Sequence, residues 1–239
     1  MTIYSNTQQS FVHYLNCESY PLQPRPRRVK VLYLEKMKKR ILKVYDQEVK
    51  RWLDAMDLYD QEITAHTLRV TALSIQLGRV LGLKDEDLKQ IQYGTLMHDI
   101  GKLGVPDSII RKPGRLSEDE YRVVQMHPLY AHEWIKKCMH EKTAQDIPLF
   151  HHERWDGNGY PYHLKGDEIP LLARVVAVVD VWDAITSDRP YRLAMSRDQA
   201  VEHLKAETGK HFEPEIVRAF LGTGIQEKQA IDYTAMLIT

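Results

Sequence analysis

The stretch Val175-Val176-Ala177-Val178-Val179-Asp180-Val181-Trp182 (residues 175–182) is an apolar run that is interrupted by a single carboxylate. Such a run predicts a buried element, and a charge buried there is strongly unfavourable unless it is paired or bound to a metal ion. Taken alone, Asp180 is explained equally well as a helix cap or as half of an ion pair. It becomes a candidate metal ligand if other ligands lie near it.

Two short clusters elsewhere in the chain supply such ligands. His98 and Asp99 stand in the stretch HDIGK (98–102), and His151 and His152 stand in HHERWDGNGYP (151–161). Either cluster alone is weak evidence, because an isolated HD pair is often a core histidine and HHE could be a surface run. Their combination with Asp180 favours a metal site.

Helical spacing adds further candidates. Glu62 and His66 are four residues apart and can touch one cation together. The adjacent His98 and Asp99 offer a nitrogen and a carboxylate that can bridge two metals. The candidate set has five imidazoles, three carboxylates and no sulfur: Glu62, His66, His98, Asp99, His127, His151, His152 and Asp180. Such a set suits iron or manganese first and zinc or nickel next, and eight ligands predict two or three ions.

Length, charge and cysteine content limit the alternatives. The 239 residues suit one domain with an appendage, and 33 basic residues balance 33 acidic ones, so no global field attracts nucleic acid. Cys17 and Cys138 lie far apart, which indicates a reducing compartment. The sequence offers no apolar stretch long enough for a membrane span and no secretion signal. We expect a cytoplasmic protein that binds neither membrane nor DNA.

Hydrophobic periodicity predicts an all-α fold, with no convincing strand. A long amphipathic helix is predicted from Leu34 to near Asp60, either packing on its own domain or serving as a dimerisation or relay helix. Other helices are predicted from Glu62 to Leu81, from Asp85 through His98 until the glycines at 101 and 104, and from a capping box at Ser117 to His127, where Pro128 follows. The remaining ones are a short helix after Pro148 with His151 and His152, and helices from Pro170 to Thr186, from Ser196 to before Gly209, and from Pro214.

Several motifs agree in order and spacing with one known family. They are HDIGK (98–102), Pro106-Asp107, Lys112-Pro113-Gly114, HHERWDGNGYP (151–161), and Asp180-Val181-Trp182-Asp183-Ala184 with Ser187-Asp188-Arg189-Pro190-Tyr191-Arg192. The sequence resembles the HD-GYP family of bacterial cyclic dinucleotide phosphodiesterases, a branch of the HD superfamily. The resemblance implies an HD-type helical bundle with a metal site in its core over residues 45–222. Residues 1–44 would form a short N-terminal region and the start of a linker helix, too short for the sensor domain that family members usually carry, and residues 223–239 a tail.

The resemblance also implies roles for individual residues. The eight candidates above would bind metal, with Glu62 at the position that the family associates with a third ion. Lys102 would contact the scissile phosphate and act with Asp99 in catalysis, and the substrate would lie among Lys102, Tyr160, Arg189 and Arg192. The expected reaction is hydrolysis of cyclic di-GMP to linear pGpG, in some members followed by a second cut to GMP. Asp183, one turn from Asp180, could orient a ligand or accept a proton, and a structural role beside the ligands is the preferred assignment.

Three other functions stay open at this point. A close variant would hydrolyse 3',3'-cyclic GMP-AMP instead of cyclic di-GMP. A non-catalytic adaptor would use the exposed loop at 156–161 to bind a diguanylate cyclase, although a complete set of polar ligands argues against that. A nucleotide triphosphohydrolase of the wider superfamily is disfavoured by the GYP segment.

Overall fold

The computed structural model describes residues 53–58, 60–138, 142–188 and 193–224. Regular structure in these residues is helical, apart from an isolated bridge between Thr208 and Phe212, so the predicted all-α fold is confirmed. Residues 53–58 are helical as well. The further elements are α4 (Gln61–Val80), α5 (Asp85–Met97), η1 (Ile100–Gly104), α6 (Asp107–Ile110), α7 (Glu118–Val124), α8 (His127–Cys138), α9 (Lys142–Phe150), η2 (Gly166–Glu168), α10 (Leu171–Thr186), α11 (Arg197–Ala206) and α12 (Pro214–Gly222).

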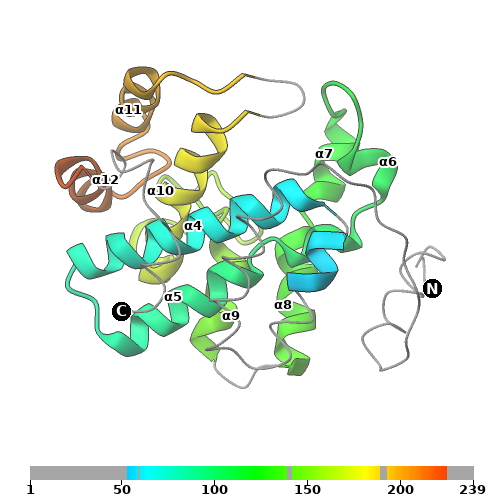
Figure 1. The fold of residues 1–239 in the computed structure, drawn as a ribbon, viewed down its shortest axis with the longest axis horizontal. Coiled ribbons are helices and arrows are strands. Elements are labelled where there is room, and N and C mark those ends of the chain that lie inside the picture. Colours follow the sequence, from blue (N-terminus) through cyan, green and yellow to red (C-terminus); the bar gives the residue numbers. More distant parts are fainter. Residues whose placement is uncertain (1–52, 59, 139–141, 189–192, 225–239) are drawn as a thin grey trace.

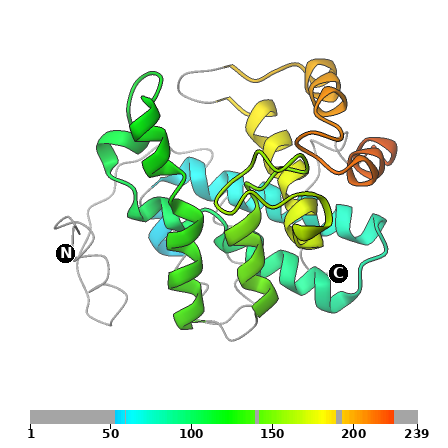
Figure 2. The same cartoon turned by 180° about the vertical axis from the view of Figure 1, so that it is seen from behind.

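Helices α4, α5 and α10 form the centre of the molecule (Figure 1). α4 packs on both α5 and α10, and α10 also touches α9, α11 and α12. Their facing side chains, among them Leu68, Ile91 and Val176, are completely buried. The pair α11 and α12 lies at one end of the bundle and the pair α6 and α7 at the other (Figures 1 and 2).

Two central helices have boundaries that the sequence predicts well. α4 begins after Asp60, whose carboxylate accepts the backbone N–H of Glu62 at 2.8 Å. α10 follows Pro170 and ends at Thr186, as expected. Ten of its sixteen residues are buried, and Trp182 meets the ring of Phe220 with a centroid separation of 5.4 Å. The apolar run around Asp180 is therefore one buried helix.

The turn after α5 packs directly on α8. Gly101 lies against the first turn of α8, where a Cβ atom would come within 1.9 Å of the carbonyl oxygen of His127 and 2.7 Å of the amide nitrogen of Ala131. Only glycine permits this approach of two backbones. The element that carries His98 and Asp99 is thus held against the element that carries His127.

The helix predicted over Ser117–His127 is shorter than expected. Its capping box is confirmed, since the Ser117 hydroxyl accepts the N–H of Glu120 and the Glu120 carboxylate accepts the N–H of Ser117. However, α7 ends at Val124, and His127 begins α8 with Pro128 behind it. The prediction that the helix stops at His127 was wrong because proline fits the first turn of a helix, where its missing N–H needs no partner.

Two other local predictions also need correction. α5 ends at Met97 with His98 as its C-cap, and the chain continues as the 3₁₀ turn η1, so Lys102 does not lie on an extension of α5. A helix that begins after Pro148 was expected to contain His151 and His152. Instead α9 runs through Pro148 and ends at Phe150, so both histidines lie in the turn that follows. Ile147 and Leu149 are buried on either side of that proline, so packing outweighs the hydrogen bond that it removes.

The predicted helix from Leu34 to near Asp60 lies mostly outside the described residues, and only its end at 53–58 is seen to be helical. The predicted domain boundaries at 44 and 222 stay predictions. Within the described part of the chain, none of the helices combines the length and the hydropathy of a membrane span.

Candidate metal centre

Seven of the eight predicted ligands converge in the middle of the bundle. They come from α4, the turn after α5, the start of α8, the turn after α9 and the middle of α10. Their donor atoms form two groups, and within each group the atoms lie within 4.8 Å of one another. One group is His66, His98 and Asp180, and the other is Asp99, His127, His151 and His152.

Asp99 connects the two groups. Its Oδ2 lies 3.6 Å from Nε2 of His98, which belongs to the first group, and its Oδ1 lies 3.5 Å from Nε2 of His127 in the second. Lys102 also contacts this carboxylate, with Nζ 2.6 Å from Oδ2. The carboxylate thus has the position that a ligand shared by two ions would need.

Backbone carbonyls fix the tautomer of three histidines. Nδ1 of His98 lies 2.6 Å from the carbonyl of Thr95, Nδ1 of His127 lies 2.8 Å from that of Val124, and Nδ1 of His151 contacts a backbone carbonyl in the same way. A carbonyl oxygen only accepts hydrogen bonds, so each Nδ1 must carry a proton. The lone pair of each neutral ring is therefore on Nε2, the atom that points into the centre.

The arrangement of these lone pairs fits a bound cation. Nε2 of His127 and Nε2 of His151 lie 3.4 Å apart, and with both Nδ1 atoms protonated neither Nε2 can donate to the other. Nε2 of His98 is buried and has no hydrogen-bond partner among the described residues. Buried acceptors facing one another in this way are costly, and a cation between them removes the cost. The nitrogen and oxygen donors without sulfur agree with a transition metal of borderline to hard character.

The acid–base state of the second group also favours metal binding. Burial lowers the pKa of His127 to about 4 and that of His151 to about 3, and it holds the pKa of His152 well below its usual value. Burial opposes ionisation of Asp99, but the Lys102 ammonium beside it holds its pKa well below the usual range. Near neutral pH the group therefore offers neutral imidazoles and an ionised carboxylate, which are the forms that bind metals.

His66 is held differently, by two carboxylates from α10. Its Nε2 lies 2.9 Å from Oδ1 of Asp180 and its Nδ1 lies 2.6 Å from Oδ2 of Asp183. Burial alone would lower the pKa of His66, but these two hydrogen-bonded carboxylates raise it to about 9. Nε2 of His66 must therefore release a proton before it can bind a cation.

Arg69 is a residue of this network that sequence reasoning missed. Its Nε donates to Oδ1 of Asp183 at 2.6 Å and its Nη2 donates to Oδ2 at 2.8 Å. Asp183 was predicted either to orient a ligand or to accept a proton, and the geometry favours the orienting role, since both of its oxygens already accept hydrogen bonds. The spacing of His66 and Arg69 by three residues on α4 was the available signal.

The other predicted site residues have different surroundings. Glu62 is exposed in the first turn of α4 and belongs to neither ligand group, so its part in a third ion stays a prediction. Tyr160 stacks on His152 with a centroid separation of 4.7 Å and an interplanar angle of 24°. Arg189 and Arg192 lie outside the described residues.

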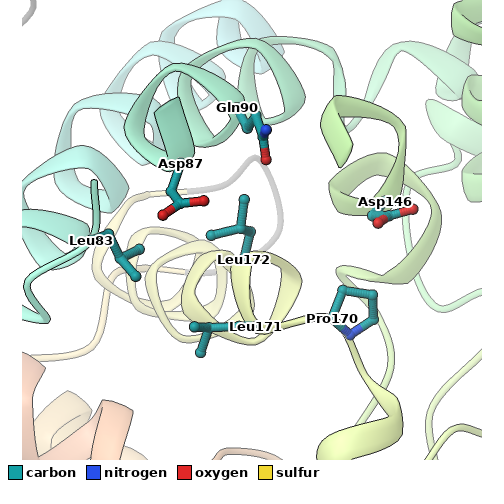
Figure 3. A pocket seen from close by; sticks show the side chains of 7 residues that line it. All are labelled: Leu83, Asp87, Gln90, Asp146, Pro170, Leu171 and Leu172. Carbon is teal, nitrogen blue, oxygen red and sulfur yellow. The ribbon is translucent and has the colours of Figure 1, made fainter. Parts of the chain in front are cut away.

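A separate pocket of about 200 Å³ lies between α5, α9 and the start of α10 (Figure 3). Leu171 and Leu172 contribute its apolar side, and Asp87 and Asp146 stand on either side of it. No lining residue belongs to either ligand group. This pocket is therefore distinct from the metal centre.

One family model covers all the residues of this centre. The family model described as HD domain matches residues 52–216, a span that contains every candidate ligand. This chain belongs to the HD domain family. The family relationship that the motifs predicted is thereby confirmed.

Curated relatives of this HD domain chain are named as cyclic dinucleotide phosphodiesterases. A cyclic di-GMP phosphodiesterase of Pseudomonas aeruginosa is 42% identical over 163 residues, which cover 68% of this chain and 39% of that protein. One from Thermotoga maritima is 36% identical, covering 80% of this chain and 54% of the relative. A 3'3'-cGAMP-specific phosphodiesterase of Vibrio cholerae is also 36% identical, covering 70% and 33%. The chain thus spans about a third to a half of the length of these relatives.

A solved structure shows the same fold at low sequence identity. An HDG"Y"P protein from Bdellovibrio bacteriovorus superposes on the HD domain chain with a TM-score of 0.57 at 20% identity, covering 79% of this chain and 69% of the other. This likeness supports the helical architecture.

Proposed function

We propose that this HD domain chain hydrolyses cyclic di-GMP to linear pGpG in a metal-dependent reaction. The observation that carries the proposal is the convergence of two ligand groups on Asp99, with the Lys102 ammonium beside its carboxylate. Relatives named as cyclic di-GMP phosphodiesterases, at 36–42% identity, support the substrate. A second cut to GMP is part of the same proposal.

The seven clustered residues would hold two ions, iron or manganese first, with zinc or nickel next. When bound, such ions activate the attacking water and neutralise charge on the phosphoryl oxygens. A third ion would need Glu62, which would have to turn inward from the first turn of α4.

Side chains of the protein would bind the phosphate and the nucleotide. Lys102 is about a quarter exposed, so its ammonium can donate to a non-bridging phosphate oxygen while it stays near Asp99. Tyr160, on the surface of His152, would contact the nucleotide from the loop. Arg189 and Arg192 would complete the substrate contacts.

A second candidate substrate, 3',3'-cyclic GMP-AMP, is supported by the names of other relatives. Relatives named as 3'3'-cGAMP-specific phosphodiesterases match at 36–38% identity, within the same range as the cyclic di-GMP enzymes. Both substrates carry the same phosphodiester, so the metal centre serves either one and the nucleobase contacts would select between them. A diguanylate cyclase partner at the loop 156–161, a homodimer through the helix predicted from Leu34 to near Asp60, and a cytoplasmic location stay predictions.

The test is product chromatography with anaerobically purified protein, coupled to metal analysis. Cyclic di-GMP and 3',3'-cyclic GMP-AMP are offered separately, after reconstitution with iron or manganese. We expect two or three equivalents of metal and conversion of cyclic di-GMP to pGpG. A fully metallated protein that cleaves neither dinucleotide would overturn the proposal and favour the adaptor function. Cleavage of 3',3'-cyclic GMP-AMP alone would establish the second candidate.

A further inference from the structure

Glu153 follows the two clustered histidines and carries a buried carboxylate whose role no motif explains. Glu153 is only 2% exposed. One oxygen accepts the backbone N–H of Tyr162 at 2.7 Å, and the other accepts the backbone N–H of Leu164 at 3.1 Å. Both oxygens are therefore engaged by the chain as it returns from the loop that begins at Asp156. A carboxylate held in this way is neither a free base nor a member of the ligand groups.

The loop that leads to Tyr162 folds back onto the residues that precede it, His152 to Arg154. The N–H of Tyr160 donates to the carbonyl of His152 at 3.2 Å. At Gly159 a Cβ atom would come within 2.3 Å of the amide nitrogen of Arg154 and 2.5 Å of Cα of Glu153, so a side chain is excluded there. These contacts leave the ring of Tyr160 stacked on the imidazole of His152.

We propose that Glu153 is a positioning residue that acts on the metal centre through Tyr160. The two hydrogen bonds of Glu153 hold the backbone that follows Tyr160, at Tyr162 and Leu164. The hydrogen bond from the N–H of Tyr160 to the carbonyl of His152 holds the backbone at Tyr160 itself. The ring is thereby kept flat against His152 and sets the plane of that imidazole. This inference rests on the proposed function only in that His152 is taken as a metal ligand.

The expected size of the effect follows from how outer contacts influence metal sites. Loss of a group that orients a ligand typically lowers metal affinity about 10- to 100-fold. Glu153 acts through one intermediate ring, so we expect about a tenfold loss, at the lower end of that range. Glu153→Gln is the informative change, because glutamine keeps the volume but replaces one of the two oxygens with an NH₂ group, which faces one of the two backbone N–H donors and cannot accept from it.

The experiment is calorimetric titration of the metal-free protein with Mn²⁺, together with hydrogen exchange at the amides of Tyr162 and Leu164. Four variants are compared with the parent: Glu153→Gln, Tyr160→Ala, the double variant, and Glu168→Gln as a matched control. Glu168 also accepts a backbone N–H, that of Lys165 at 2.9 Å, but it is exposed and outside the ligand groups.

We expect Glu153→Gln and Tyr160→Ala each to weaken Mn²⁺ binding about tenfold, and the double variant to be no weaker than Tyr160→Ala. Glu168→Gln should bind Mn²⁺ like the parent. Unchanged Mn²⁺ affinity in Glu153→Gln, or losses that add in the double variant, would overturn the inference, since a purely structural glutamate would not act through Tyr160. Because the readout uses no nucleotide, a parent protein that binds Mn²⁺ but hydrolyses no cyclic dinucleotide would refute the proposed function and leave this test valid.

Discussion

Replacing Asp183 with asparagine tests whether the α10 carboxylate controls the first ligand group. The change conserves shape, but Asp183 accepts hydrogen bonds through both oxygens, from His66 and from Nε and Nη2 of Arg69. Asparagine has one acceptor oxygen, so in either orientation its NH₂ group faces a donor of His66 or Arg69. The hydrogen bonds that orient His66 are thereby weakened, while His66 itself is kept.

The magnitude follows from these contacts. Loss of a partner that orients a metal-binding histidine lowers affinity about 10- to 100-fold, which corresponds to about 1.4–2.7 kcal/mol. Removing the charge of Asp183 also lowers the pKa of His66 and so eases release of its proton, and we therefore expect a loss at the lower end of this range, about tenfold. The free energy of unfolding should also fall, because hydrogen bonds to Asp183 are lost. The loss is limited to about 1–2 kcal/mol, since Arg69 is partly exposed and water can replace part of its hydrogen bonding. Metal binding is therefore the more specific of the two effects.

The assay is Mn²⁺ titration of metal-free Asp183→Asn by calorimetry, with the unfolding transition measured in parallel. Asp167→Asn is the matched control, because Asp167 also pairs with an arginine, Arg174 at 3.0 Å, but is almost fully exposed and belongs to neither ligand group. It should leave Mn²⁺ affinity unchanged. If folded Asp183→Asn bound Mn²⁺ as tightly as the parent, the orienting role of Asp183 would be refuted.

Three further predictions concern the chemistry of the centre. The double variant His98→Ala/Asp99→Ala should lose hydrolysis while its circular dichroism stays helical, and substantial remaining turnover would contradict the catalytic assignment. Lys102→Ala should lower kcat by about one to three orders of magnitude at unchanged metal content, and unchanged kinetics would show that Lys102 only pairs with Asp99. The pKa of His66 is raised to about 9 in the metal-free protein, so its contribution to stability is complete below pH 6.5 and is lost as the pH rises through 9. Mn²⁺ must displace that proton, and its affinity should therefore rise about tenfold per pH unit between pH 7 and 9, with proton release measured by calorimetry in two buffers.

The sequence was sufficient for the elements whose signals are local. The capping box at Ser117, the apolar run that ends at Thr186 and the proline at 214 each predict a helix start or end that the structure confirms. These signals depend on neighbours a few residues away, which are visible in the chain. The ligand clusters were recognisable for the same reason.

Predictions failed or were missing where contacts between distant segments decide the structure. His151 and His152 follow a helix that was expected to contain them, because packing of Ile147 and Leu149 extends α9 through Pro148. The partners of Asp183 lie more than a hundred residues away on α4, so nothing near it in the sequence reveals them. The role of Glu153 likewise depends on where the loop returns, which spacing alone does not indicate.

The contact at Gly101 determines how adaptable this centre is. The segments that carry Asp99 and His127 meet backbone to backbone, with no side chain between them whose size could be varied. The spacing of these two ligands is therefore insensitive to substitutions in the surrounding core. Random libraries of core variants should accordingly change the melting temperature and leave the preferred ionic radius as it is, whereas a new metal preference would have to come from exchanging the ligands themselves.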